Sequence, residues 1–307
     1  MILGIIGYFW GPEVLSKDFL KPVEEEFGVC ISKTINFKQK TMGTFIKWGL
    51  NWRKKFQWGE AFNKPGHCSY ATDAMVHQDQ NDSIPLELHL QLNCRCQDNG
   101  STRFDVGAIC LVENELGPSG FYEPKLLNNF KIELEAKLPP GKLMWPAFWL
   151  YYSGGEEHTV GYKYLEFDVF EGWSGPNGNY KSQILKDNGC LYSKDEDQSF
   201  LVQTIYGVKK NVLQQKKRTM YKNFRNEYEV DNLTTQYHKF SIQRTDSVIT
   251  MECDDEVLIS IGKSNKRFKY LKDPVYLMIN NGACCAKIDS DTANSILYIR
   301  NLSIQEL

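Results

Sequence analysis

Short runs of alternating apolar and polar residues recur along the chain. In the clearest run, Leu86, Leu88, Leu90 and Leu92 take every second position and His89 falls between them. Successive side chains of a β-strand point to opposite faces, so this run predicts a strand with buried leucines and with His89 on the surface. The same period of two recurs at 132–138, 240–242 and 259–261.

The runs are short, and Gly, Asn, Asp and Pro separate them. Many short alternating strands joined by such turns are typical of an all-β sandwich of two antiparallel sheets rather than an α/β fold. A chain of 307 residues with 42% hydrophobic content can bury a large core. We therefore expect one domain over 1–307, with 1–60 as a candidate N-terminal extension packed on it.

Three carboxylates stand among apolar residues in the segment 165–173. In an extended strand Glu166 and Asp168 point to one face. Glu171 lies five positions after Glu166, and this odd spacing would place it on the opposite face of a regular strand. A β-bulge at about 169–170 would return Glu171 to the face of the other two acids.

Two interpretations of these acids are open at this point. Carboxyl groups that share a groove are suited to cleaving a glycosidic bond. Alternatively, the alternation describes a strand with one solvated face, where acids are common. Three like charges on one strand destabilise it unless a site uses them, which favours the first interpretation.

The neighbouring motifs make a resemblance specific. A strand ends in the turn Leu-Pro-Pro-Gly at 138–141, and Trp-Pro-Ala-Phe-Trp at 145–149 and Glu-x-Asp-x-x-Glu at 166–171 follow it. This order resembles the laminarinase-type enzymes of glycoside hydrolase family 16. The resemblance covers roughly 69–304 and is sharpest at 131–173. It implies a curved, concanavalin-like β-jelly roll and hydrolysis of β-linked glucans or galactans with retention of configuration.

The resemblance also implies a role for each acid. Glu166 is expected to attack the anomeric carbon, and Glu171 to protonate the leaving oxygen and then activate water. Asp168 lies between them and is expected to orient Glu166 by a hydrogen bond, while its charge favours the protonated form of Glu171.

Five further residues are candidate substrate contacts. Trp145, Trp149 and Trp173 have flat faces that suit sugar rings, although each could equally belong to the core. Asn280 is expected near a strand end on the concave face. Tyr206 stands where relatives commonly have a histidine, and its hydroxyl still donates a hydrogen bond. Which β-linked polymer is cut is therefore left open.

Neither a metal nor a cofactor is expected. Many relatives have an aspartate near the C-terminus that helps to hold a structural calcium, and this chain has Leu297 there. A leucine offers no oxygen ligand.

Charge argues against a polyanionic partner. The formal net charge of −2 gives no general field for nucleic acid or an anionic membrane, and no apolar run is long enough to span a bilayer. The aromatic and basic residues of 45–58 could stack on sugars, bases or a membrane surface, but such residues more often form a half-buried lid or core. The expected partner is a polysaccharide or oligosaccharide, and the oligomeric state is unknown.

The cysteines and the first residues bear on the compartment. Nine cysteines without metal-ligand spacing favour reduced thiols. Residues 1–10 lack a basic segment and a cleavage site, so no signal peptide is expected. Members of the family are mostly secreted, and intracellular synthesis with release by lysis or in a viral particle would reconcile these observations.

Taken together, the sequence favours a retaining endo-glycosidase. The alternative is a non-catalytic carbohydrate-binding or virion-surface module on the same fold, because a fold does not settle a function.

Overall fold

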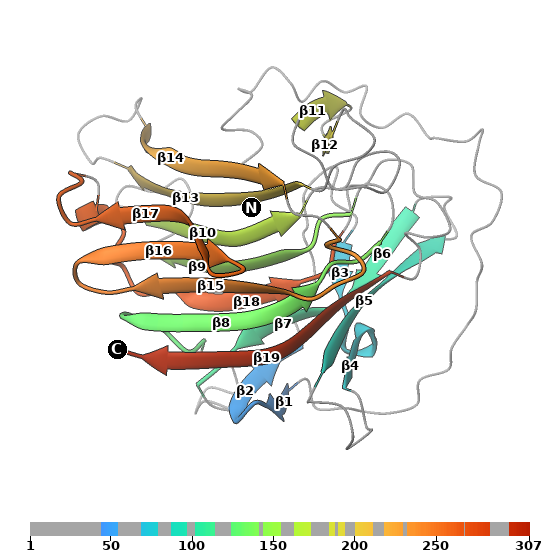
Figure 1. Ribbon diagram of the computed structural model, residues 1–307. Coiled ribbons are helices and arrows are strands. Elements are labelled where there is room, and N and C mark those ends of the chain that lie inside the picture. The colour runs from blue at the N-terminus through green and yellow to red at the C-terminus, as the bar shows by residue number, and fades with distance from the viewer. Residues whose placement is uncertain are drawn as a thin grey trace.

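A computed structural model describes residues 44–54, 69–78, 87–96, 102–113, 124–140, 144–154, 163–172, 184–187, 190–193, 200–210, 218–229, 232–266, 268–282 and 295–307. Two twisted sheets pack face to face (Figure 1). The predicted all-β sandwich is confirmed. Among the described residues, no helix is long and apolar enough to cross a bilayer.

One sheet has eight strands. Their order across the sheet is β1 (Thr44–Lys47), β2 (Leu50–Arg53), β7 (Ala108–Leu111), β18 (Tyr276–Asn280), β9 (Ala147–Gly154), β10 (Lys163–Gly172), β13 (Phe200–Lys210) and β14 (Arg218–Glu229). The sheet combines neighbours that follow each other in the chain, such as β9 and β10, with neighbours that are distant in sequence, such as β18 and β9. A separate hairpin joins β11 (Ile184–Asp187) and β12 (Cys190–Ser193).

The other sheet has nine strands. Their order is β17 (Glu256–Gly262), β16 (Val248–Cys253), β15 (His238–Arg244), β8 (Phe130–Lys137), β19 (Ile296–Glu306), β5 (Leu88–Cys96), β6 (Thr102–Val106) and β3 (Ser69–Ala71), and β4 (Val76–Gln78) pairs with β5. All pairings are antiparallel except that of β3 with β6. The single-turn 3-10 helices η3 (Asp73–Met75) and η4 (Phe268–Tyr270) lie in connections.

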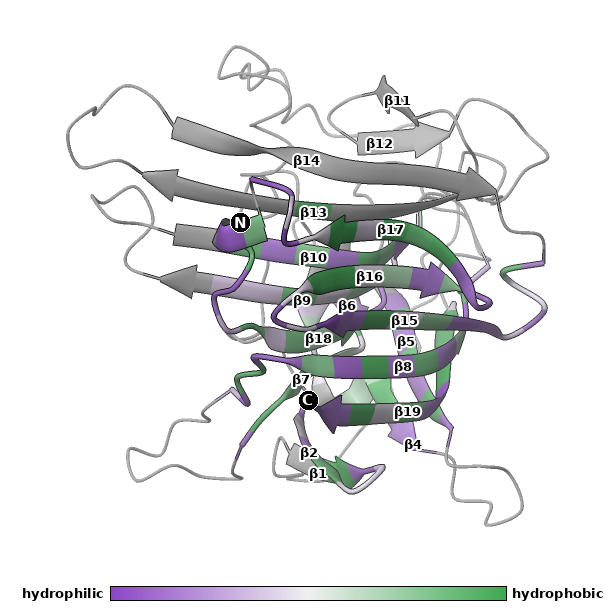
Figure 2. Ribbon diagram, turned by 60° about the vertical axis from the view of Figure 1, so that its left-hand side comes forward, coloured by the Kyte–Doolittle hydropathy of each residue, from purple (hydrophilic) through white to green (hydrophobic). Residues whose placement is uncertain are grey.

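The period of two sets which side chains are buried. On β5 the side chains of Leu88, Leu90 and Leu92 are fully buried, and β8 alternates buried and half-buried positions throughout. Figure 2 shows the same alternation as bands of hydrophobic and hydrophilic residues along β8. The leucine pattern is confirmed on β5, while Leu86 lies outside the described residues.

Tight turns follow the local sequence. Trp48 and Gly49 join β1 to β2 with φ values of 54° and 70°, the backbone of a two-residue hairpin. Trp52 is fully buried, so this part of the aromatic and basic stretch belongs to the core, whereas 55–60 lies outside the described residues. Residues 1–43 are also outside them, and the candidate N-terminal extension stays a prediction.

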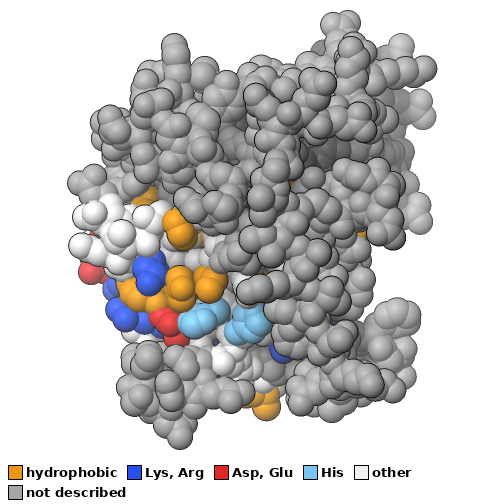
Figure 3. Space-filling view, turned by 90° about the vertical axis from the view of Figure 1, so that its right-hand side faces the viewer, with side chains coloured by type: hydrophobic (Ala, Val, Ile, Leu, Met, Phe, Trp, Pro, Cys, Tyr) orange, Lys and Arg blue, Asp and Glu red, His pale blue; other side chains and the backbone are white. Residues whose placement is uncertain are grey.

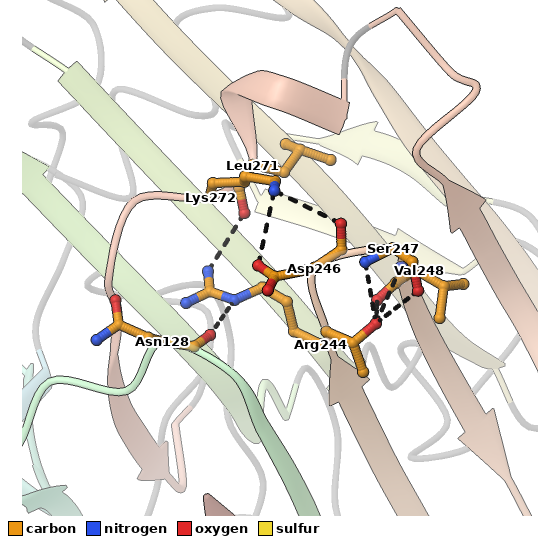
Figure 4. A network of polar contacts seen from close by, with 8 residues as sticks. Asn128, Arg244, Asp246, Ser247, Val248, Leu271 and Lys272 are labelled. Atoms are coloured by element: carbon orange, nitrogen blue, oxygen red, sulfur yellow. Dashed lines mark hydrogen bonds and ion pairs between the residues drawn. The ribbon is translucent and has the colours of Figure 1, made fainter. Parts of the chain in front are cut away.

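Arg244 on β15 is a buried cation that links several main-chain segments of the sandwich. The Arg244 guanidinium donates hydrogen bonds to the main-chain oxygens of Leu127 (2.7 Å) and Asp273 (2.9 Å), and also to those of Asn128 and Leu271. Figure 4 shows the two bonds to Asn128 and Leu271. Burial lowers the pKa of Arg244 to about 10. The side chain therefore remains charged at neutral pH.

Candidate active site

The three acids lie on β10, at the point where its pairing with both neighbours is irregular. Between Asp168 and Phe170, β10 advances by two residues while β9 advances by one. The register with β13 shifts between Asp168 and Glu171. One extra residue in a strand is a β-bulge, and here it is Val169. The bulge predicted from the spacing of the acids is confirmed.

The bulge brings the three carboxylates to one face. Glu166, Asp168 and Glu171 stand opposite alternate residues of β9, namely Tyr151, Trp149 and Ala147. Alternate residues of one strand share a face, so their partners do too.

The apolar residues of the same strand point the other way. Phe167, Val169 and Phe170 are fully buried. The ring of Phe170 lies 4.6 Å from that of Phe240 on β15, which belongs to the nine-stranded sheet. The acids therefore lie on the face of the eight-stranded sheet that points away from the sandwich core.

Glu166 and Asp168 are tightly enclosed, each with only 3% of its surface exposed. Burial raises the pKa of Asp168 well above its usual value, and the negative charges of Glu166 and Glu171 raise it further. A side-chain hydrogen bond with Glu166 acts in the same direction. Two ionised carboxylates cannot hydrogen-bond to each other, so a bond between these side chains needs a proton on one of them, and the raised pKa of Asp168 favours its protonated form.

Trp145 contacts Glu171 through the edge of its ring. Its Nε1 group donates a hydrogen bond of 2.8 Å to Oε1 of Glu171. Its main-chain N–H donates to the oxygen of Gly282 at 2.7 Å, so the backbone is fixed as well. With 8% of its surface exposed, Trp145 offers little face to a sugar ring in this structure. Its role as a platform for a sugar stays a prediction.

Trp149 and Asn280 form a second polar pair on the same face. Trp149 Nε1 donates a hydrogen bond of 2.9 Å to Oδ1 of Asn280. The two side chains are 3% and 5% exposed, respectively. Asn280 is the last residue of β18, at the strand end where the sequence placed it. Whether either residue contacts substrate stays a prediction.

The structure also locates the other candidate contacts. Tyr206 on β13 pairs directly with Glu166, although its side chain is outside the described part. Trp173 lies outside the described residues. The pairing of the strands also brings two tyrosines to this face that the sequence analysis missed. Tyr151 stands opposite Glu166, and Tyr276 stands opposite Tyr151.

Tyr151 could have been found from parity. Tyr151 is two residues after Trp149 and therefore shares its face. Its ring lies 5.9 Å from that of Trp149 and 5.4 Å from that of Tyr276. The packed aromatic rings form one side of the surface around Glu166.

Metal-ligand and cysteine side chains can be located in the described ranges alone. Within the described ranges, no group of three or more His, Cys, Asp or Glu side chains is arranged to hold a metal ion. Leu297 is fully buried in the core. Cys110 and Cys253 are buried, and burial raises the pKa of the Cys110 thiol to about 12.

Comparison with known proteins finds similarity in structure alone. No protein-family model and no curated protein matches the sequence. Among solved structures, a Bacteroides ovatus glycoside hydrolase family 16 protein from a mixed-linkage glucan locus, in complex with a product, matches with a TM-score of 0.56 and 17% identity. That match covers 86% of this chain and 98% of the other.

Two further structures show the same fold. The catalytic domain of a Thermotoga petrophila laminarinase, an endo-1,3-β-glucanase, has a TM-score of 0.52 and 17% identity, covering 85% of this chain and 92% of its own. A kappa-carrageenase from Zobellia galactanivorans has a TM-score of 0.54 and 13% identity, covering 80% and 86%. The chain therefore has the jelly-roll fold of these glycoside hydrolases, and its resemblance to glycoside hydrolase family 16 is confirmed at the level of the fold.

Proposed function

We propose that the protein is a retaining endo-glycosidase that hydrolyses a β-linked polysaccharide of the β-glucan or galactan class by double displacement. The observation that carries the proposal is the bulge in β10, because it places Glu171 on the face of Glu166 and Asp168. Retaining glycosidases need two carboxyl groups on either side of the bond that is cut. A strand with a merely solvated face has no need of the bulge.

The two glutamates would divide the reaction between them. Glu166 attacks the anomeric carbon and forms a glycosyl ester, while Glu171 gives its proton to the leaving oxygen. Glu171, now a carboxylate, then takes a proton from water as the water attacks the ester, and Glu166 is released. The hydrogen bond from Trp145 would stabilise the carboxylate of Glu171 at this stage.

Asp168 would act on Glu166. Its raised pKa favours the protonated form, which would donate a hydrogen bond to the nucleophile and fix its orientation. This differs in part from the sequence expectation, in which Asp168 acts on Glu171 through a negative charge. A neutral Asp168 also limits the repulsion among three carboxyl groups on one strand.

A carbohydrate-binding module without turnover is the second candidate. The position of Tyr206 supports it, since relatives commonly have histidine there and Tyr206 pairs directly with Glu166. A binding module would hold the same polymers and release no reducing ends.

The experiment is a reducing-end assay on laminarin, lichenan, agar, carrageenan and xyloglucan. Wild type should cut at least one polymer, and Glu166→Ala should cut none, with azide restoring cleavage and inverting the product. Glu171→Ala should lose polymer cleavage but keep most of its first step on a nitrophenyl glycoside, which needs little acid assistance. Glu133→Ala, a carboxylate on the nine-stranded sheet, is the control and should match wild type.

The outcomes separate the assignments. If azide rescues Glu171→Ala with inversion instead, the two roles are reversed. If wild type binds a polymer without releasing reducing ends, the binding module is correct and the enzyme is not.

A further inference from the structure

A single row of ring-bearing and basic side chains crosses the nine-stranded sheet. His77 on β4 pairs with His89 on β5, His89 pairs with Tyr298 on β19, and Tyr298 pairs with Lys137 on β8. Tyr237 precedes His238, which pairs with Ala136, so Tyr237 stands beside Lys137. We call these five residues the outer row.

The outer row faces away from the sandwich core. Its sequence neighbours Leu88, Leu90, Leu297 and Ala136 are fully buried, whereas the row itself is half-buried. In the space-filling view, histidine side chains lie beside hydrophobic, basic and acidic ones in the described part of one face (Figure 3). The carboxylates of β10 lie on the opposite outer face of the sandwich, so both sheets separate them from the outer row.

Contacts within the outer row hold its rings in place. The Lys137 Nζ atom lies 4.1 Å from the centroid of the Tyr298 ring and 5.3 Å from that of Tyr237. The His89 and Tyr298 rings pack edge to face with their centroids 4.7 Å apart. The Arg300 guanidinium lies 3.8 Å from the Tyr237 ring. Rings held in this way are already ordered, so binding to them costs less conformational entropy.

The row offers the groups that sugars need. A phenol combines an apolar ring with a hydroxyl, and a sugar has apolar C–H faces and many hydroxyls. In the part of the chain that the structure describes, neither Tyr237 nor Tyr298 uses its hydroxyl in a hydrogen bond. Four strand spacings of about 4.8 Å give the row a length of roughly 19 Å. That length suits a stretch of several sugar rings.

Charge around the row favours a neutral ligand. Arg300 is paired with Glu135 at 2.6 Å, and His89 with Glu87 at 2.7 Å. A surface for polynucleotide or an acidic polymer would need several unpaired cations. The charge of Lys137 lies against the two tyrosine rings. The row therefore combines aromatic surface and hydrogen-bonding groups with little net charge.

We propose that the outer row is a second, non-catalytic binding surface for a neutral polysaccharide. The identity of that polymer rests on the proposed function, because we take it to be the polymer that the enzyme cuts. A polysaccharide long enough to reach both faces would be held at the outer row while it is cut at the β10 carboxylates. Attachment at two places raises the effective concentration of polymer at the acids without any new contact there.

The test separates binding from cleavage. In a Glu166→Ala background, where the polymer is not consumed, affinity electrophoresis in gels with laminarin, lichenan or xyloglucan measures binding directly. Tyr237→Phe/Tyr298→Phe removes only the two hydroxyls and should weaken binding about tenfold. Tyr237→Ala/Tyr298→Ala should abolish the contribution of the row. Gln243→Ala, at the other end of β15 on the same face, is the control and should bind like the parent.

Turnover gives the second readout. With Glu166 intact, the tyrosine variants should raise KM for long polymer and leave kcat/KM on a short nitrophenyl oligosaccharide unchanged. Equal polymer binding by parent and row variants, or no polymer binding by the parent, would overturn the proposal. So would a dimer of the parent that the row variants dissociate, since a second copy of the chain would then cover the row. Row-dependent binding without any cleavage would retain this proposal and reject the enzymatic one.

Discussion

Trp145→Phe tests the assignment of Glu171 as the proton donor. The substitution keeps an aromatic ring but removes the indole N–H, which donates a 2.8 Å hydrogen bond to Oε1 of Glu171. That bond favours the carboxylate form of Glu171 over the protonated form. Its loss makes protonation easier. The pH range in which Glu171 can act as an acid should therefore extend upward.

The size of the effect follows from the bond. A hydrogen bond to a charged acceptor is worth about 1.5–3 kcal/mol, and about 1.4 kcal/mol corresponds to one pH unit. Glu171 is only half-buried, so water replaces part of the lost bond. We expect the alkaline limb of the kcat/KM profile to move up by about one unit. The acidic limb, which reports the nucleophile, should stay in place.

The assay is the pH profile of kcat/KM on the best polymer from pH 4 to 10. Trp149→Phe is the matched control, because it removes an indole N–H that is bonded to Asn280 instead of a carboxylate. Both variants leave a space in a buried site and should lose a similar amount of stability. Only Trp145→Phe should shift the alkaline limb. A shift of the acidic limb alone, or equal profiles for the two variants, would refute the assignment of Glu171.

Three further changes test the supporting structure. The pKa of Asp168 is raised in the folded state, so the folded protein holds this proton more tightly than the unfolded chain does. Wild-type stability therefore falls as pH rises from about 4 through the raised value. In urea melts, Asp168→Asn should become progressively more stable than wild type toward neutral pH, and a difference that does not change with pH would contradict the shift. Arg244→Met removes the donor that serves four carbonyl oxygens and should lower the free energy of unfolding by about 3–5 kcal/mol. Lys272→Ala, at an exposed side chain, should lower it by less than about 0.5 kcal/mol. Similar urea midpoints for the two variants would show that the Arg244 hydrogen bonds do not stabilise the fold. In Gly282→Ala the new Cβ would lie 2.9 Å from the main-chain oxygen of Trp145. We therefore expect kcat to fall and the alkaline limb of the kcat/KM profile to move as in Trp145→Phe. An unchanged pH profile would show that the backbone relaxes without disturbing Trp145.

Local sequence determined the strands and the acid face. The leucines of β5 and the acids of β10 follow a period of two, and that period alone decides which side of a strand a residue occupies. The same parity required a bulge, because Glu166 and Glu171 are an odd number of positions apart. Each of these conclusions depends on residues within one strand, so a single sequence contains the information.

Tertiary structure decided what the side chains touch. The sequence named Trp145 and Trp149 as candidate sugar platforms but could not show that their N–H groups bind Glu171 and Asn280, partners 26 and 131 residues away. Arg244 meets carbonyl groups 27 to 117 residues away, and the outer row exists only through the pairing of strands that are distant in the chain. Cross-strand register depends on how both sheets bury their apolar faces together, so no local pattern in the sequence specifies it.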